Sequence, residues 1–418
     1  MHGQAIIFDS KEIPPPLCGD EPGSFAEDTL SRRLPDIARR VLEDEDWPLE
    51  GRARLQALID EMPHGRIRPI MDEGAPDLGL WEDWLPPFLG QTWLDAPWFA
   101  AEVYFFRRVL EATGYFRPGR GQGVDPYRRQ KLEGLKGVLD QLRPLCAALE
   151  GAPGQGASQG ATAGPTVVGP TVVGLLHSVI WGNQADLSVW PVDGDQPANH
   201  SGDQRLAHLL ADDSQAFADF LAQAGDGLPR VDFILDNVGL ELAYDLLLAD
   251  FLLGSGKTRI VRFYVKPFPT YVSDATAADV LALVAHIAGA EDEALRRLGT
   301  RLHGCLDEQR LELHTDLYWV SPLAGWEMPP ETRRELGRAG LLVSKGDANY
   351  RRWLGDRHWP FTTPIDEILA YSPAPLLLLR VLKSEIVAGL KPGQAEEMDQ
   401  KDPEWLFNGS WGVIQFVP

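Results

Sequence analysis

The feature that most constrains the fold is a series of short apolar segments, rich in β-branched and aromatic residues, that alternate with helical patterns. Such segments span 231–235 and 260–265, and each precedes a stretch whose apolar residues recur at three- and four-residue spacing. Another apolar segment spans 340–344. Because a crossover helix returns the chain to the same end of a sheet, this order predicts an α/β fold with a mostly parallel sheet covered on both faces.

The first third of the chain shows a helical pattern instead. It extends over about 30–150, and its clearest stretch is 96–115, where Asp95 is a candidate N-cap and Pro97 falls near the first turn. A chain of 418 residues with 44% hydrophobic content is long enough for two domains. We therefore expect a helical N-terminal domain over 1–150 and an α/β catalytic domain over 175–418.

The segment between these two regions has a composition of its own. Residues 151–174 are rich in Gly, Ala, Ser and Pro, and Gly-Pro-Thr-Val-Val occurs at 164–168 and again at 169–173. Such a segment has little apolar surface to bury, so we expect a flexible insertion.

Composition narrows the classes of partner and the compartment. There are 61 acidic and 39 basic residues, giving a net charge of −22, which argues against a nucleic-acid partner but leaves a small anion in a locally positive pocket possible. Cys18, Cys146 and Cys305 show no zinc-binding spacing and are expected to be buried thiols in a reducing compartment. Neither a leader pattern nor a membrane-spanning stretch is evident, so we expect a cytoplasmic protein without a membrane partner.

Two polar residues follow the first of the predicted strands. Asp236 and Asn237 come directly after the segment 231–235, where an acid and an amide offer the hard oxygen ligands that suit Mg²⁺ or Mn²⁺. The alternative is a helix cap or turn that opens the following helix.

A second carboxylate follows the next strand. Asp274 comes after the segment 260–265, and with Asp236 and Asn237 it could complete a three-ligand oxygen site that leaves positions open for water and substrate. The alternative is that Asp274 or Thr276 caps the next helix. If the site is catalytic, the nucleophile could be Asp236, Asp274 or a water bound to the metal.

Cations and sugar-binding residue types follow the later apolar segments. The stretch 345–351 contains Lys, Gly, Asp, Asn, Tyr and Arg residues, types that bind hydroxyls and phosphates, and is a candidate substrate loop. Arg380 and Lys383 follow the apolar stretch 375–379 and could reach the same cleft. The alternative is that each of these cations is a surface charge.

Two other features are not interpreted as functional. The sequence Gly-Ser-Gly-Lys-Thr at 254–258 looks like the end of a phosphate-binding P-loop, but Phe251 stands where that motif needs glycine. A helix precedes it and a strand follows, so it is interpreted as a helix C-cap and turn. His303 and His314 lack metal-ligand spacing and are interpreted as structural.

Taken in order, the chain from about 34 to 416 resembles the damage-control phosphatase family, in the branch named for its acidic-residue methyltransferase-like member. The resemblance is carried by a series of short motifs along the sequence. They are Ala96 to Phe99 with Glu102, Arg107 and Arg108; Trp181 to Asn183 with Asp186 to Ser188; Phe233 to Gly239 with Glu241; Val272 to Asp274; Lys345 to Arg351; Gly355 to Arg357; Arg380 to Lys383; and Trp411 to Phe416.

The resemblance implies a helical domain packed on a three-layer α/β/α sandwich, and a site built from matching residues. A divalent metal, Mn²⁺, Mg²⁺, Co²⁺ or Ni²⁺, would be bound by Asp236, Asn237 and Asp274. Lys383 would grip the phosphate of a phosphorylated small molecule, and Asp236, Asp274 and Lys383 would be the catalytic group. The further substrate-contacting residues would be Asn237, Asp347, Asn349, Tyr350, Arg351, Glu241, Glu102 and Asn183.

Members that resemble this branch hydrolyse sugar phosphates such as fructose phosphates. This chain has Val381 where the family's Arg-Thr-x-Lys motif has threonine, and the insertion at 151–174 is not part of the family pattern. Both departures keep open a phosphatase that serves one pathway and acts on an unusual phosphorylated substrate. Two other hypotheses remain. One is an S-adenosylmethionine-dependent carboxyl methyltransferase, against which stands the lack of a glycine-rich cofactor loop in the sequence. The other is a metabolite-binding protein without activity.

Overall fold

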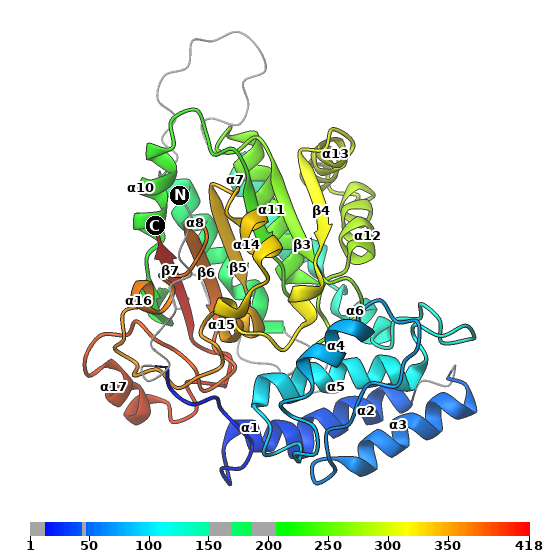
Figure 1. Cartoon of the computed structure of the whole chain (residues 1–418). Coiled ribbons are helices and arrows are strands. Elements are labelled where there is room, and N and C mark those ends of the chain that lie inside the picture. The colour runs from blue at the N-terminus through cyan, green and yellow to red at the C-terminus, as the bar shows by residue number, and fades with distance from the viewer. Residues whose placement is uncertain (1–12, 44–46, 151–168, 186–205) are drawn as a thin grey trace, which may run out of the picture.

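The computed structural model describes residues 13–43, 47–150, 169–185 and 206–418. Within them the chain forms a helical N-terminal region that lies across one end of an α/β region (Figure 1). The helical region contains α1 (Phe25–Asp28), a π-helical turn (Thr29–Arg33), α2 (Leu34–Leu42), α3 (Leu49–Glu61), α4 (Leu78–Trp84), α5 (Trp98–Thr113) and α6 (Arg128–Gly134).

Helix α5 forms the centre of the helical region because all of its residues are buried. It ends at Gly114, whose positive φ of 77° suits a glycine C-cap. The helix begins one residue after Pro97, which occupies the N-cap position. The prediction that Asp95 caps it is wrong: the Asp95 carboxylate instead accepts a hydrogen bond of 2.7 Å from the Thr92 hydroxyl in the preceding turn.

A seven-stranded sheet in the order β1-β7-β6-β5-β2-β3-β4 forms the middle of the α/β region. Every neighbouring pair is parallel except β6 and β7, which are antiparallel. The predicted strands appear as β2, β3 and β5, with boundaries that differ by one residue at most. The strands are β1 (Leu209–Asp212), β2 (Val231–Ile234), β3 (Val261–Val265), β4 (Leu311–Thr315), β5 (Leu341–Lys345), β6 (Leu376–Val381) and β7 (Gly412–Val417).

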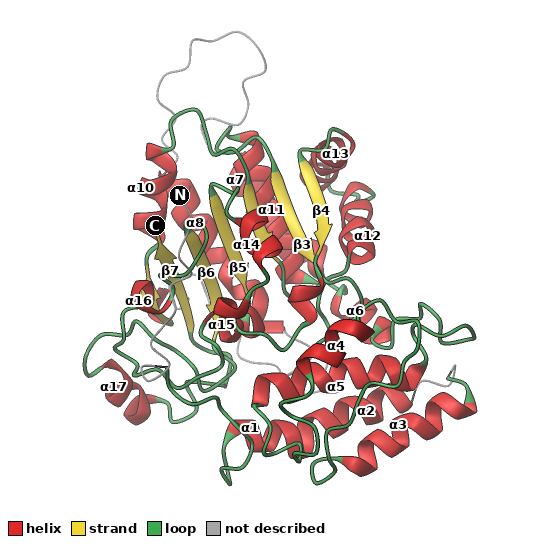
Figure 2. Ribbon diagram, viewed as in Figure 1, coloured by secondary structure: helices red, strands yellow, loops and turns green. Residues whose placement is uncertain are grey.

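Helices cover both faces of the sheet, which confirms the predicted α/β sandwich (Figure 2). Side chains alternate along each strand, so that Leu341 and Val343 join one core while Leu342 joins the other. The first core is covered by α7 (Val138–Glu150), α8 (Gly169–Val179), α10 (Ser214–Gln223), α11 (Leu240–Gly254), α12 (Ala277–Ala288) and α13 (Glu293–Asp307). The second is covered by α14 (Pro330–Leu336), α15 (Asp347–Trp353) and α16 (Ile365–Ile368), with α17 (Gln394–Lys401) near them.

The structure moves two of the predicted boundaries. Helix α7 packs against α11 and α13 in the core of the α/β region, so the helical region ends before it rather than at residue 150. The second copy of the repeat opens α8 and buries Val172 completely, so 169–174 are not a flexible insertion. Residues 151–168 lie outside the described residues.

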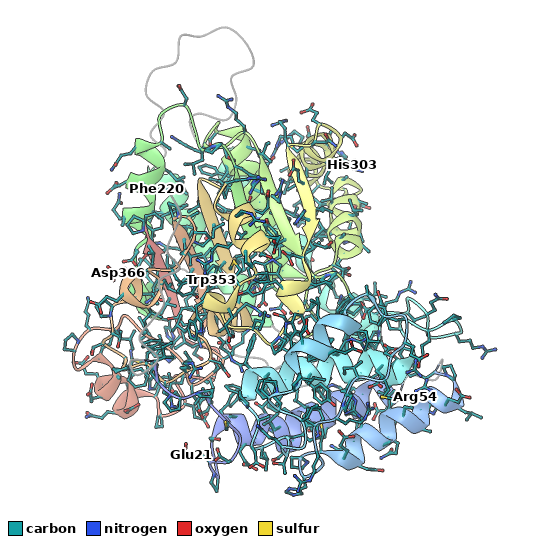
Figure 3. All side chains as sticks on the ribbon, in the orientation of Figure 1. Glu21, Arg54, Phe220, His303, Trp353 and Asp366 are labelled. Atoms are coloured by element: carbon teal, nitrogen blue, oxygen red, sulfur yellow. The ribbon has the colours of Figure 1, made fainter. Side chains whose placement is uncertain are left out.

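Three smaller expectations can be compared with the structure. Residues 254–258 end α11 and turn at Gly256, as predicted. His303 is exposed on α13, at the end of the α/β region away from the helical region (Figure 3). Among the described helices, none has the length and apolar character needed to cross a membrane.

Candidate active site

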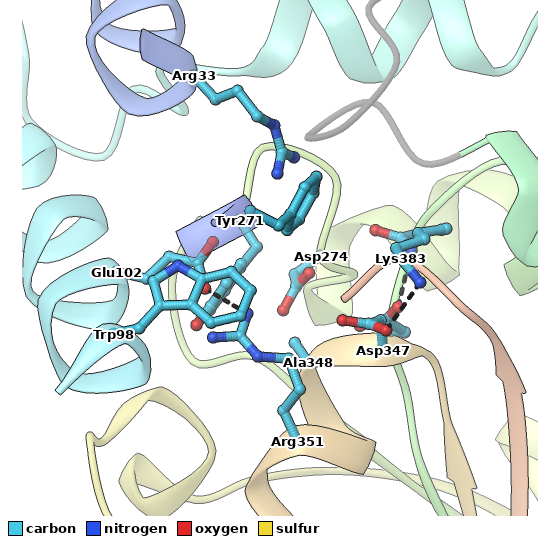
Figure 4. Close-up of a pocket in the computed structure, with 12 residues that line it drawn as sticks. Arg33, Trp98, Glu102, Tyr271, Asp274, Asp347, Ala348, Arg351 and Lys383 are labelled. Atoms are coloured by element: carbon cyan, nitrogen blue, oxygen red, sulfur yellow. Dashed lines mark hydrogen bonds and ion pairs between the residues drawn. The ribbon is translucent and has the colours of Figure 1, made fainter. Parts of the chain in front are cut away.

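A small cavity lies where the carboxyl ends of the parallel strands meet the helical region. In open α/β sheets this is where ligands bind. Its free volume is about 30 Å³, which has room for an ion or a water molecule. Seven residues singled out from the sequence line it (Figure 4): Glu102, Asp236, Asn237, Asp274, Asp347, Arg351 and Lys383.

Asp236 and Asn237 follow β2 and are both buried. They do not cap α11, whose N-cap is Gly239, so their side chains are left for the cavity. The Asn237 amide nitrogen donates to Asp236 Oδ2 at 2.8 Å and to Glu241 Oε2 at 3.0 Å. The Ser273 hydroxyl donates to Asn237 Oδ1 at 2.6 Å. These bonds fix the amide with its oxygen beside the loop that carries Asp274.

The lack of a side chain at Gly346 leaves room for the carboxylate of Asp236. A Cβ atom at residue 346 would lie 1.8 Å from Asp236 Oδ2, and the φ of +82° is one that side chains rarely adopt. Glycine is therefore required by both space and backbone conformation at this turn between β5 and α15.

Asp274 is presented by a strained loop after β3. Tyr271 and Val272 have φ values of 46° and 65°, which are costly for residues other than glycine and often occur at functional sites. Thr276 caps α12, so Asp274 is not used as a cap. Lys266 Nζ lies 3.1 Å from Asp274 Oδ2, and both side chains are buried.

The donor set can be tested for its fit to the predicted metal. No group of three or more His, Cys, Asp or Glu side chains arranged to hold a metal occurs in the described part of the chain. The predicted set contains only two carboxylates, with the amide of Asn237 as the third donor. All three donors are oxygens that line one cavity, a chemistry that fits a hard divalent cation and not zinc held by Cys or His.

A buried lysine lies beneath these residues. The side chain of Lys345 is completely buried, with Nζ 3.0 Å from Asp245 Oδ1 and 3.5 Å from Glu241 Oε1. Burial raises the pKa of Asp245 to about 7, and the charge of Glu241 adds to the rise while Lys345 opposes it. Sequence reasoning placed Lys345 in the candidate substrate loop and not beneath it, and it missed Asp245, although Glu241 and Asp245 are acids four residues apart on a mostly apolar helix.

Asp347 and Lys383 lie together at the ends of β5 and β6 (Figure 4). Asp347 Oδ1 is 2.7 Å from Arg380 Nη2 and accepts hydrogen bonds of 3.1 Å from the Lys383 backbone amide and from the Ser384 hydroxyl. Arg380 is thus a buried partner of Asp347. Of the two cations at the end of β6, Lys383 is the one that lines the cavity.

Arg351 is held from three sides. Its guanidinium bonds Glu102 Oε2 at 2.6 Å and Asp356 Oδ1 at 2.7 Å, and its charge lies 3.6 Å from the centre of the Trp98 ring. Burial raises the pKa of Glu102, an effect that the neighbouring Arg351 opposes. This arrangement fixes a cation at the boundary between α5 and α15.

Three predicted substrate residues, Asn349, Tyr350 and Glu241, are not among the described residues that line the cavity. The Asn349 amide donates to the carbonyls of Leu235 and Lys345, and the Tyr350 hydroxyl donates to Gln415. Both side chains thus hold the loop 345–351 in position without lining the cavity. Glu241 lies one layer below the cavity, against Asn237. The side chain of Asn183 lies outside the described part of the structure. Val381, the departure from the family motif, is buried in the first core and not in the cavity.

Three further residues that the sequence reasoning did not single out reach the cavity: Arg33 and Phe25 from the helical region, and Tyr271 from the loop that carries Asp274. Arg33 ends the π-helical turn, and its guanidinium lies 4.7 Å from the centre of the Phe25 ring. Phe25 and Tyr271 also line the cavity. Figure 4 shows Arg33 entering from the side opposite Arg351. Local π-helical turns often occur at functional sites, but none is visible in the sequence.

The sequence of the chain matches one protein family over most of its length. The model of the damage-control phosphatase ARMT1-like domain matches residues 29–398. The chain belongs to this family. That membership confirms the resemblance found in the sequence and makes the chain a hydrolase of the damage-control phosphatase type.

Individual relatives agree with the family match. Damage-control phosphatase ARMT1 of Rattus norvegicus is 30% identical, with 97% of this chain and 99% of that protein covered. The Homo sapiens protein of the same name is 29% identical, with coverage of 97% and 98%. A crystal structure of a DUF89 family protein from Pyrococcus horikoshii covers 94% of this chain and 98% of its own, with 14% identity and a TM-score of 0.45.

Proposed function

We propose that the protein is a cytoplasmic, metal-dependent phosphatase of phosphorylated small metabolites, with sugar phosphates such as fructose phosphates as the preferred class. The observation that carries the proposal is the convergence of Asp236, Asn237, Asp274 and Lys383 on one buried cavity. Of the three cysteines that were expected to be buried, Cys146 and Cys305 are buried, whereas Cys18 is only partly so.

The charge of the cavity supports metal dependence. Four carboxylates line it, from Glu102, Asp236, Asp274 and Asp347, against three cations, from Arg33, Arg351 and Lys383, so the formal charge is 3 − 4 = −1. A phosphate monoester, itself a dianion near neutral pH, would be repelled by such a site. A divalent cation would reverse the sign, because −1 + 2 = +1. Asp236, Asn237 and Asp274 would hold that ion, which when bound would draw negative charge from the phosphoryl oxygens.

The remaining residues divide into a phosphate side and a sugar side. Lys383 would bind the phosphoryl oxygens as a point charge, held in place through its backbone bond to Asp347. Asp347 would accept hydrogen bonds from sugar hydroxyls, and Arg351 would donate to them from its fixed position. Charge stabilisation and alignment are the main requirements of phosphoryl transfer, and these residues supply both.

The cavity is smaller than a sugar phosphate. Its free volume of about 30 Å³ suits an ion, whereas small-molecule sites usually enclose about 300–1,000 Å³. We therefore expect Phe25 and Arg33, which cover it from the helical region, to move when substrate enters.

Phosphate release by metal-stripped protein tests the proposal. A panel of sugar and nucleotide phosphates would be assayed with Mg²⁺, Mn²⁺, Co²⁺ or Ni²⁺ added back separately. We expect metal-dependent release, highest for sugar phosphates, that falls at least about 1,000-fold in Asp236→Asn and in Lys383→Met, since each removes a charge aimed at the transition state.

Matched controls come from exposed residues of the same types. Asp366→Asn on α16 and Lys391→Met after β6 change the same functional groups at the surface and should retain full activity (Figure 3). Release that needs no metal, or that survives Asp236→Asn, would overturn the assignment of the metal site. A preference for nucleotide phosphates would overturn the proposed substrate class alone.

A further inference from the structure

A second, larger cavity lies behind the candidate active site. It is enclosed by α6, the segment before it and the first turns of α12, at the junction of the helical and α/β regions. Its volume is about 560 Å³, within the range of about 300–1,000 Å³ usual for small-molecule sites. It shares no lining residue with the candidate active site, so it is a separate cavity.

The walls of this second cavity combine an apolar surface with a few charged groups. Leu132, Leu135 and Leu242 line it, together with several proline and alanine side chains. Lys131 is buried there with Nζ 3.0 Å from Asp125 and 2.8 Å from Asp279, a link between the helical region and the first turn of α12. Apolar walls with a small number of converging polar groups are typical of ligand sites.

The charge in this cavity favours an anion. Arg128, Lys131 and Lys266 line it against Asp125 and Asp279, so its formal charge is 3 − 2 = +1 in a protein of net charge −22. Lys131 is already neutralised by the two aspartates, and Lys266 is paired with Asp274, which does not line this cavity. The groups able to meet an anion are therefore the exposed Arg128 at the mouth and, in exchange for Asp274, Lys266.

We propose that the second cavity is an effector site for a small molecule that joins one anionic group to an apolar body. The anion would lie near Lys266 and Arg128, and the apolar body would cover the leucine side chains of α6 and α11. A molecule of this kind would offset the positive charge and bury apolar surface in one step.

Lys266 connects this cavity to the candidate active site. It lines the second cavity, while its Nζ lies 3.1 Å from Oδ2 of Asp274, which lines the first. An anion that attracts the Lys266 ammonium weakens its pairing with Asp274 and frees that carboxylate for a metal ion. This coupling rests on the proposed function, whereas binding at the second cavity does not.

Fluorescence titration with 8-anilinonaphthalene-1-sulfonate, an aromatic monoanion, tests the site. We expect one saturable site in the full-length protein, weakened at least 10-fold by Ala282→Trp, which fills the cavity from an exposed position on α12. Leu281→Trp adds the same ring beside it, at a residue that is exposed and does not line the cavity, and should leave binding within 2-fold. No saturable binding, or equal binding by Ala282→Trp and the unmodified protein, would overturn the proposal.

Calorimetric titration with Mn²⁺ tests the coupling without an activity assay. Saturating dye should tighten Mn²⁺ binding at least 3-fold in the unmodified protein and in Leu281→Trp, but not in Ala282→Trp. Reciprocal coupling requires that Mn²⁺ tighten dye binding by the same factor. Unchanged or weaker Mn²⁺ binding would overturn the coupling. An absence of Mn²⁺ binding would overturn the metal-dependent function and the coupling together, while the dye titration alone decides whether the second cavity binds a ligand.

Discussion

The helical region and the α/β region each bury a network of ion pairs, and the two networks differ in where they end. In the helical region Arg107 bonds Asp77 at 2.7 Å and Asp72 at 3.0 Å, and Arg117 bonds Asp72 at 2.9 Å. In the α/β region the chain of contacts from Asp245 through Lys345, Glu241 and Asn237 ends at Asp236, which lines the candidate active site.

The difference separates an ion-pair network that does not reach the cavity from one that does. Arg107 was one of the family's sequence markers, yet it lies outside the residues that line the candidate active site. Burial, opposite charge and short distances are common to both networks, so these properties alone do not identify a site. The distinguishing property is contact with groups that face a cavity.

The largest effect is expected from breaking the network of the helical region. Arg107→Met leaves the buried Asp77 without its guanidinium partner and the buried Asp72 with Arg117 alone, which should lower the free energy of unfolding by about 3–5 kcal/mol. The activity of the folded fraction should stay within about 2-fold of normal, because kcat/KM changes only when contacts that stabilise the transition state are lost. Urea denaturation and steady-state kinetics measure the two effects.

The control for this variant is Arg143→Met. Arg143 is half exposed and bonds Asp140 at 2.9 Å, so its loss should cost at most about 1 kcal/mol. If Arg107→Met were as stable as this control, or if it lost activity while remaining folded, the assignment of a purely structural network would be wrong.

The second effect is a pH dependence of stability that arises in the α/β network. The pKa of Asp245 is raised to about 7, above its ordinary value, mainly by burial. Between about pH 4 and pH 7 the folded state therefore holds a proton that the unfolded state has lost, so this group stabilises the protein at low pH and the stabilisation disappears as the pH rises through 7. The full change is at most about 4 kcal/mol.

Asp245→Asn removes this titration. The unfolding free energy of the unmodified protein, measured relative to the variant at a series of pH values, should fall between pH 4 and pH 7 and level off above. A difference that is constant over this range would show that Asp245 does not titrate there.

The smallest of the three effects tests whether the network of the α/β region supports metal binding. Lys345→Met removes the cation that the structure places against both Glu241 and Asp245, so the two buried carboxylates repel and the hydrogen bond between Glu241 and Asn237 changes. Loss of such an outer partner usually costs about 10- to 100-fold in metal affinity. Calorimetric titration of Mn²⁺ measures it, with Lys391→Met as the exposed control. Mn²⁺ affinity equal to that of the control would make Lys345 a structural residue like Arg107.

Sequence reasoning located the residues that follow strands. Asp236 and Asp274 were predicted together because they follow consecutive strands, and parallel pairing of β2 and β3 brings the ends of such strands together. Asn349 and Tyr350 were predicted as substrate residues from their chemistry and from the family resemblance. The direction of a side chain depends on packing, and here both were directed toward backbone or core partners.

The sequence could not show which side chains of the helical region contact the α/β region. Arg33 and Phe25 lie about 200 to 350 residues before the strands whose cavity they cover, and no local pattern relates them. The same holds for α7, which a helical pattern could not assign to one core or the other. Tertiary packing decides these placements, and periodicity reports only which face of an element is apolar.

The position of β7 has a consequence for synthesis of the chain. Strand β1 (Leu209–Asp212) pairs only with β7 (Gly412–Val417) among the strands of the sheet, and β7 lies about 200 residues later. At a rate of about 5–20 residues per second, β1 emerges from the ribosome roughly 10–40 s before its partner exists. During that time its edge is open to other chains, so this stretch is where a chaperone would be most useful.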